Sequence, residues 1–256
     1  MSAHAQLPLE PARESGQSVT PAYEGWFKNA DGSIGFLLGY YNRNRSQTLD
    51  IPVGPDNRIE PGGPDRGQPT HFLPLRQWGV FAIIVPAAEA RGGTLTWTLT
   101  ANGRTLSVPM TLNKDYEVEP LRDAAVGNMP PVLRFDPPGA QFQGPPHGIG
   151  FTLAAKAGRP LTIAAVISDD NAADPRRAPG DTPLSVSWSQ FRGPGPIKFG
   201  TAKSAVGSAG GPVSTTATFD TPGDYVVRAQ ANDVTGDGGA GFQCCWTTAL
   251  ISVRAE

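Results

Sequence analysis

The sequence predicts an all-β protein built as two tandem antiparallel β-sandwiches. Its 256 residues include 31 glycines and 26 prolines, which separate short alternating runs rich in Val, Ile, Thr and aromatic residues. Glycines and prolines at this spacing are typical of strands joined by frequent turns. No window of twelve residues keeps an apolar stripe at helical spacing without a Gly or Pro inside it, so we expect little helix. A chain of this length suits two sandwiches of about 100 residues better than one compact unit.

Six strands are predicted in the first half, at residues 23–29, 33–42, 47–51, 80–85, 94–100 and 104–108. The motif Asn29-Ala30-Asp31-Gly32 joins the first pair as a hairpin. Asn102-Gly103 joins the last pair, and both of these residues can take the positive φ of a type I′ turn. In the strand 94–100 apolar residues alternate with threonine, which predicts one buried and one wet face. The apolar members are Leu95, Trp97 and Leu99.

A charged segment without alternation divides the chain. It covers residues 114–130, is followed by a second proline at Pro131, and is typical of an interdomain linker. We therefore predict four parts. They are an extended or disordered N-terminal segment (1–20), a first sandwich (21–113), the linker (114–130) and a second sandwich (131–256).

The second half repeats the pattern, with strands predicted at residues 151–155, 161–168, 184–189, 197–199, 213–219, 224–232 and 242–253. Its stretch TPGDYVVRAQAND, residues 221–233, resembles the penultimate-strand motif of PKD-type and related immunoglobulin-like domains. The resemblance implies an immunoglobulin-like sandwich in which Tyr225 fills a tyrosine corner, with its hydroxyl on a nearby backbone group. It also implies that Trp188 is the buried tryptophan of the third strand. Val227 is not a cysteine, so the inter-sheet disulfide of antibody domains is absent.

Three segments of the first half, residues 23–27, 39–45 and 67–72, resemble exported bacterial proteins of unassigned role. Ala3-His4-Ala5 has the small-x-small pattern that a signal peptidase leaves, although an ordinary disordered N-terminus explains this tripeptide equally well. Gly-, Pro- and Thr-rich sandwiches with few charges are common outside the cytoplasm. We therefore predict an exported protein, periplasmic or extracellular.

Charge and motif content exclude several classes of function. The formal net charge of −2 provides no positive potential that would bind nucleic acid or an anionic membrane. No apolar run approaches the roughly 20 residues of a membrane span. The sequence has no G-x-S-x-G, no H-E-x-x-H and no P-loop. Its three histidines are His4, His71 and His147, and nothing near them identifies a nucleophile.

The two cysteines, Cys244 and Cys245, are adjacent. In an oxidising compartment each has only the other as an intramolecular partner, which favours a vicinal disulfide. Such a bond needs a local break in the strand, because neighbouring side chains of a regular strand point to opposite faces. The alternative is two reduced cysteines, one of them in the core.

The proline-rich segment 51–77 is the predicted contact region, together with the end of the strand before it. It holds six prolines, and long ordered loops of compact domains are often functional. Arginine and aromatic side chains are enriched at binding hot spots. The alternative is a cover over an open sheet edge. The predicted contact residues are Tyr40, Tyr41, Arg43, Arg45, Arg58, Arg66, His71 and Trp78.

Two acidic clusters are candidate calcium ligands, because calcium takes six to eight oxygens. Asx turns, in which Asp and Asn bond their own backbone, explain the same clusters. No other cofactor is expected. The candidates are Asp169, Asp170 and Asp174 in one loop and Asp233 and Asp237 in another.

These observations favour a non-catalytic exported module. Its partner would be a protein or glycan surface, or it would be a structural subunit of an envelope complex. The alternative is an exported hydrolase or metal-dependent enzyme with a site between the two domains. A concave pocket with convergent polar groups favours the enzyme, and a flat aromatic or apolar patch favours binding.

Overall fold

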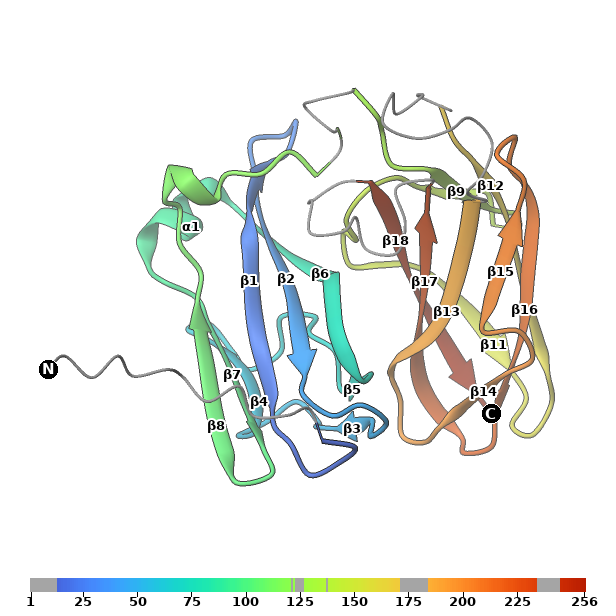
Figure 1. Ribbon diagram of the computed structural model, residues 1–256, viewed down its shortest axis with the longest axis horizontal. Helices are drawn as coiled ribbons and strands as arrows, with labels where there is room; N and C mark the ends of the chain where they lie inside the picture. The colour runs from blue at the N-terminus through green and yellow to red at the C-terminus, as the bar shows by residue number, and fades with distance from the viewer. Residues whose placement is uncertain (1–12, 121, 123–126, 137, 171–183, 234–244) are drawn as a thin grey trace, which may run out of the picture.

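Figure 1 shows a computed structural model of the protein, in which residues 13–120, 122, 127–136, 138–170, 184–233 and 245–256 are described. Two β-sandwiches stand side by side, one from each half of the chain (Figure 1). Outside the strands, the described residues contain one short helix, α1 (Ala87–Gly92), and one 3-10 turn, η1 (Lys114–Tyr116). The prediction of an all-β fold with two β-sandwiches in tandem is confirmed.

The first sandwich packs two three-stranded antiparallel sheets, in the orders β1-β2-β6 and β4-β7-β8, with a small β3-β5 pair beside them. The predicted residues Leu95, Trp97 and Leu99 lie buried in its core. The strands are β1 (Val19–Lys28), β2 (Ile34–Asn42), β3 (Leu49–Asp50), β4 (Asn57–Glu60), β5 (His71–Phe72), β6 (Leu75–Val85), β7 (Thr96–Ala101) and β8 (Arg104–Pro109).

Turn chemistry in this sandwich follows the sequence. Asn102 and Gly103 have φ of 49° and 75°, as a type I′ turn requires. The wet face expected on β7 is only partly present, because Thr98 is 7% exposed. Its Oγ1 lies 2.8 Å from Oγ of the exposed Ser107 on β8, and this cross-strand hydroxyl pair gives the buried Thr98 hydroxyl a partner.

The second sandwich packs two five-stranded sheets, in the orders β10-β9-β12-β16-β14 and β11-β18-β17-β13-β15. It is not wholly antiparallel as predicted, because β11 pairs with β18 in parallel. Trp188 lies in its core. The strands are β9 (Val132–Phe135), β10 (Ala140–Phe142), β11 (Ile149–Ala155), β12 (Leu161–Ser168), β13 (Leu184–Arg192), β14 (Ile197–Phe199), β15 (Lys203–Val206), β16 (Gly211–Phe219), β17 (Gly223–Asn232) and β18 (Trp246–Ala255).

The expected tyrosine corner is present at the start of β17. Tyr225 is fully buried, and its Oη donates to the carbonyl oxygen of Thr221 at 2.7 Å. Tyr225→Phe should therefore cost about 1 kcal/mol of unfolding free energy in urea titrations, because the Thr221 carbonyl loses its donor. Tyr41→Phe, at an exposed position, is the control and should change stability little. Equal stability of the two variants would contradict a structural role for the corner.

The parts around the sandwiches differ from the predicted organisation. Strand β1 begins at Val19, inside the predicted N-terminal segment, and Arg13 bridges to Asn44. In the predicted linker, the Val118 amide donates to the Trp26 carbonyl at 2.9 Å, so part of this segment runs along β1. The domain boundaries themselves stay a prediction.

The two sandwiches share a buried contact. Trp246 of β18 packs with Phe27 and Leu37, which lie on the face of sheet β1-β2-β6 that is turned away from β4-β7-β8. Leu250 and Phe191, from the second sandwich, belong to the core cluster of the first. Sheet β1-β2-β6 is therefore covered on both faces.

Candidate functional site

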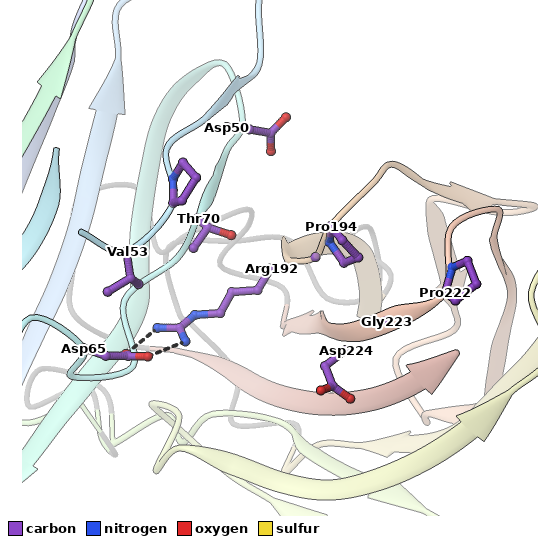
Figure 2. A pocket seen from close by; sticks show the side chains of 11 residues that line it. Asp50, Val53, Asp65, Thr70, Arg192, Pro194, Pro222, Gly223 and Asp224 are labelled. Carbon is purple, nitrogen blue, oxygen red and sulfur yellow. Dashed lines mark hydrogen bonds and ion pairs between the residues drawn. The ribbon is translucent and has the colours of Figure 1, made fainter. Parts of the chain in front are cut away.

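A groove of about 500 Å³ lies between the proline-rich loop of the first sandwich and two turns of the second (Figure 2). One wall comes from the chain around β3 and β5, and the other from the end of β13 and the start of β17. The lining residues are Asp50, Pro52, Val53, Asp65, Thr70, Arg192, Gly193, Pro194, Pro222, Gly223 and Asp224.

Arg192, the last residue of β13, links the two walls. Its Nη1 and Nη2 donate to the two carboxylate oxygens of Asp65 at 3.0 and 2.8 Å (Figure 2). Its Nε donates to the Gln68 carbonyl at 2.7 Å. These hydrogen bonds hold the pKa of the Asp65 carboxyl below its usual value. A bidentate arginine–carboxylate pair fixes geometry as well as charge, so the walls are held at a defined separation.

Two further carboxylates stand at the edges of the groove. Asp50 is exposed, and its Oδ1 lies 2.7 Å from Nδ1 of His71. Asp224 is exposed and accepts from Nε of Arg254 at 3.0 Å. With Asp65, three carboxylates lie against two guanidiniums, that of Arg192 in the lining and that of Arg254 beside Asp224. The groove therefore carries a small excess of negative charge, which favours positively charged groups on a partner.

The proline-rich loop that forms one wall is fixed by a buried amide. The Nδ2 of Asn57 donates to the carbonyls of Ile51 and Pro69 at 2.9 and 2.8 Å, and its Oδ1 accepts from Nε1 of Trp97 at 3.0 Å. The loop is thereby pinned to the core of the sandwich. The groove wall is preformed.

The functional groups of the groove come from a few of its lining residues. Its described lining offers the Thr70 hydroxyl, carboxylates and one guanidinium, and its charged groups are paired within the fold. No nucleophile with an adjacent base is found among these residues. Proline at positions 52, 194 and 222 stiffens the rims.

Tyr40 is a correction to the predicted contact surface. Its side chain is 2% exposed, lies edge-on to Phe72 with ring centroids 4.9 Å apart, and accepts from the Leu73 amide at 2.8 Å. Burial raises the pKa of its hydroxyl. The residue belongs to the core because β2 is covered on both faces.

The other predicted contact residues are dispersed, and none of them lines the groove. Arg58 pairs with Glu60 at 3.0 Å, and Arg66 with Glu89 at 2.9 Å. Trp78 lies under the guanidinium of Arg76, whose Cζ is 3.9 Å from the ring centroid. Tyr41 is exposed on β2, and Arg43 and Arg45 follow that strand.

The groove residues Asp50, Arg192 and Asp224 escaped the sequence analysis. Residues 52, 53, 65 and 70 of the predicted contact segment line the groove, but its arginine and aromatic side chains do not. That this segment contacts a partner stays a prediction. Asp65 and Arg192 are separated by 127 positions, and no local pattern connects them.

The cysteine and calcium predictions fall partly outside the described residues. Cys244, Asp174 and Asp237 lie there, whereas Cys245 is buried with its Sγ 3.3 Å from the Asn128 carbonyl. Asp233 is buried and accepts from the Asn128 side chain, while Asp169 and Asp170 follow β12 near the surface. Within the described ranges, no group of three or more His, Cys, Asp or Glu could hold a metal ion. The vicinal disulfide and the calcium site stay predictions.

No protein-family model and no curated protein matches the sequence. Among solved structures, the chain is similar to the D00-D0 domain of intimin, at 13% identity and a TM-score of 0.30, over 93% of this chain and 99% of that chain. Domains 4 and 5 of the S-layer protein SbsC match at 14% identity and a TM-score of 0.26, over 93% and 99%. WR4, an MSP family member of C. elegans, matches at 13% and 0.30, over 48% and 97%. Likeness this low carries no argument about function.

In the described part of the chain, no helix is long and apolar enough to cross a membrane.

Proposed function

We propose that this protein is a non-catalytic exported module that binds a protein partner through the groove between its sandwiches, as a component of the cell envelope or extracellular space. The observation that carries the proposal is the Arg192–Asp65 pair, which locks the two walls of an open groove. The low charge content and the Gly- and Pro-rich composition support an exported location.

Preorganisation favours binding at this groove. Proline rims, the Asn57 hydrogen bonds and the Arg192 pair fix the backbone on both sides before a partner arrives. A surface that is already ordered loses little conformational entropy in a complex. The exposed carboxylates of Asp50 and Asp224 stand at its edges, where they would select a basic surface and speed its association.

The proposal is tested by capture from envelope extracts with quantitative mass spectrometry. Asp50→Asn/Asp224→Asn removes the two edge charges, and it should keep the fold because exposed ion pairs contribute little to stability. The amount of each partner captured by this variant should be about fivefold or more below the amount captured by the wild type. The difference should be larger at low salt than at high salt.

Two control variants make the result specific. Asp115→Asn/Asp136→Asn changes the net charge equally at exposed positions outside the groove, and it should keep the partners. Tyr41→Ala/Arg58→Ala tests the surface that was predicted from the sequence. Partners that survive the groove variant, or that are lost equally from the first control, would overturn the proposed site. Loss from the second control alone would move the contact to β2 and β4.

A further inference from the structure

A second cavity, of about 300 Å³, lies between the start of β6 and the outer face of the sheet that contains β13 and β17. It is separate from the groove and shares no lining residue with it. Seven of its ten lining residues are polar, and all seven carry hydrogen-bond donors. The residues that matter to the argument are Arg76, Trp78, Ser187, Ser189, Arg228 and Gln230.

The sheet register places the polar side chains of this cavity side by side. Ser189 is paired with Arg228, and Ser187 with Gln230, across the antiparallel β13 and β17 strands. The alternate residues Val227 and Ala229 lie in the core of the second sandwich. Because side chains alternate along a strand, the serines, the arginine and the glutamine all face the first sandwich.

Arg228 is the unusual member of this set. It is 3% exposed, and its Nη2 donates to the Trp78 carbonyl at 3.3 Å. Its Nε is buried and has no hydrogen-bond partner among the described residues. Burial lowers the pKa of this guanidinium to about 10, so it is charged at neutral pH. A buried donor of a charged group without an acceptor is costly.

The neighbouring carboxylate does not supply that acceptor. Oε1 of Glu24 accepts from Nη2 of Arg76 at 2.8 Å, and Oε2 accepts from the Gly79 amide at 2.7 Å. Glu24 and Tyr40 are the two acidic groups that lie close enough to act on the charge of Arg228. Burial raises the pKa of the Tyr40 hydroxyl, so this group is neutral at pH 7. Burial raises the pKa of the Glu24 carboxyl, and the charges of Arg76 and Arg228 oppose that shift. Two guanidiniums therefore face a single carboxyl group, which leaves positive charge in excess.

We propose that this cavity binds a small organic carboxylate, with its oxygens accepting hydrogen bonds from Arg228 and from the Ser187 and Ser189 hydroxyls. The excess positive charge favours an anion over a neutral ligand. Arginine pairs with planar carboxylates through directed hydrogen bonds. The cavity volume lies at the lower end of the range for small-molecule sites, which limits the ligand to a few non-hydrogen atoms beyond the carboxylate.

The test is a titration of the isotopically labelled full chain, followed by NMR, with sodium acetate and sodium propionate as probes. Both should saturate the shifts of the Arg228 Nε–H and of the Ser187 and Ser189 amides, with a Kd on the order of 1 mM. Sodium chloride at equal ionic strength should cause no saturable shifts of these signals. Inorganic phosphate at pH 7.5 is the dianionic comparison.

Variants separate binding from folding. Ser189→Ala should weaken acetate binding about tenfold, because one hydrogen bond to a charged group contributes about 1.5 kcal/mol, while the spectrum of the variant stays that of a folded protein. Ser214→Ala, exposed on the opposite sheet, should bind as the wild type does. Arg228→Lys should abolish saturation. Three results would each overturn the proposal. The first is the absence of saturable shifts at 100 mM acetate, about a hundredfold the expected Kd. The others are equal acetate affinity of Ser189→Ala and the wild type, and tighter binding of phosphate than of acetate.

Discussion

Gly79→Ala is expected to destabilise the protein by about 3 kcal/mol. Gly79 has a φ of +50°, and a Cβ built there would lie 2.2 Å from Cζ2 of Trp246 in the second sandwich. A left-handed backbone costs a non-glycine residue about 1–2 kcal/mol, and overpacking adds about 1–3 kcal/mol. Because Trp246 packs with Phe27 and Leu37, the added methyl group should push the two sandwiches apart. Urea unfolding and limited proteolysis at the junction measure the two effects.

Gly103→Ala is the matched control. Gly103 also has a positive φ, of 75°, but a Cβ there would meet nothing within 4 Å. This variant should therefore show the backbone strain alone, about 1 kcal/mol, without new cleavage between the sandwiches. If both variants lose the same stability, the contact of Gly79 with Trp246 does not hold the sandwiches together.

The strands that the sequence predicted well are those whose burial alternates. Leu161–Ser168 and Ile197–Phe199 were predicted with their observed bounds, since in β12 every second residue is buried and in β14 a charged residue separates the two apolar ones. Strand β4 (Asn57–Glu60) was missed because it has four residues, lies within a proline-rich segment, and pairs with β7, some forty positions away. Short pairings of this kind depend on tertiary contacts that leave no local period.

The candidate site was less accessible to sequence reasoning than the fold. Strand β2 is buried along most of its length, so no alternation distinguishes the inward Tyr40 from the outward Tyr41. The groove is formed by Asp65 and Arg192, which belong to different sandwiches. Their charges are visible in the sequence, but their pairing depends on how the sandwiches pack. The loop 51–77 could be recognised as ordered, and its groove-facing side chains could not.

Asn57→Ala is expected to cost about 3–5 kcal/mol and to disorder the wall of the groove. The substitution removes the acceptor of Trp97 Nε1 and the donors to the Ile51 and Pro69 carbonyls, all of which meet at a fully buried side chain. Each buried group left without a partner costs about 1–3 kcal/mol, and the three losses share one site, so they do not add fully. Urea unfolding measures the stability, and hydrogen exchange of the loop amides reports the order of the wall.

Asn113→Ala is the control for this change, because it removes the same side chain from an exposed position. Among the described residues, the Oδ1 of Asn113 accepts from the Asp115 amide alone, at 3.1 Å, at the start of η1. Losing a cap of this kind costs about 0.5–1 kcal/mol. The loop amides should keep their protection in this variant and lose it in Asn57→Ala. If Asn57→Ala is no less stable than Asn113→Ala, water replaces the lost partners and the loop is held by its prolines and by the Arg192 pair.

In that case capture of a partner through the groove would survive the loss of Asn57, and the wall would be preformed by backbone rigidity rather than by its buried amide.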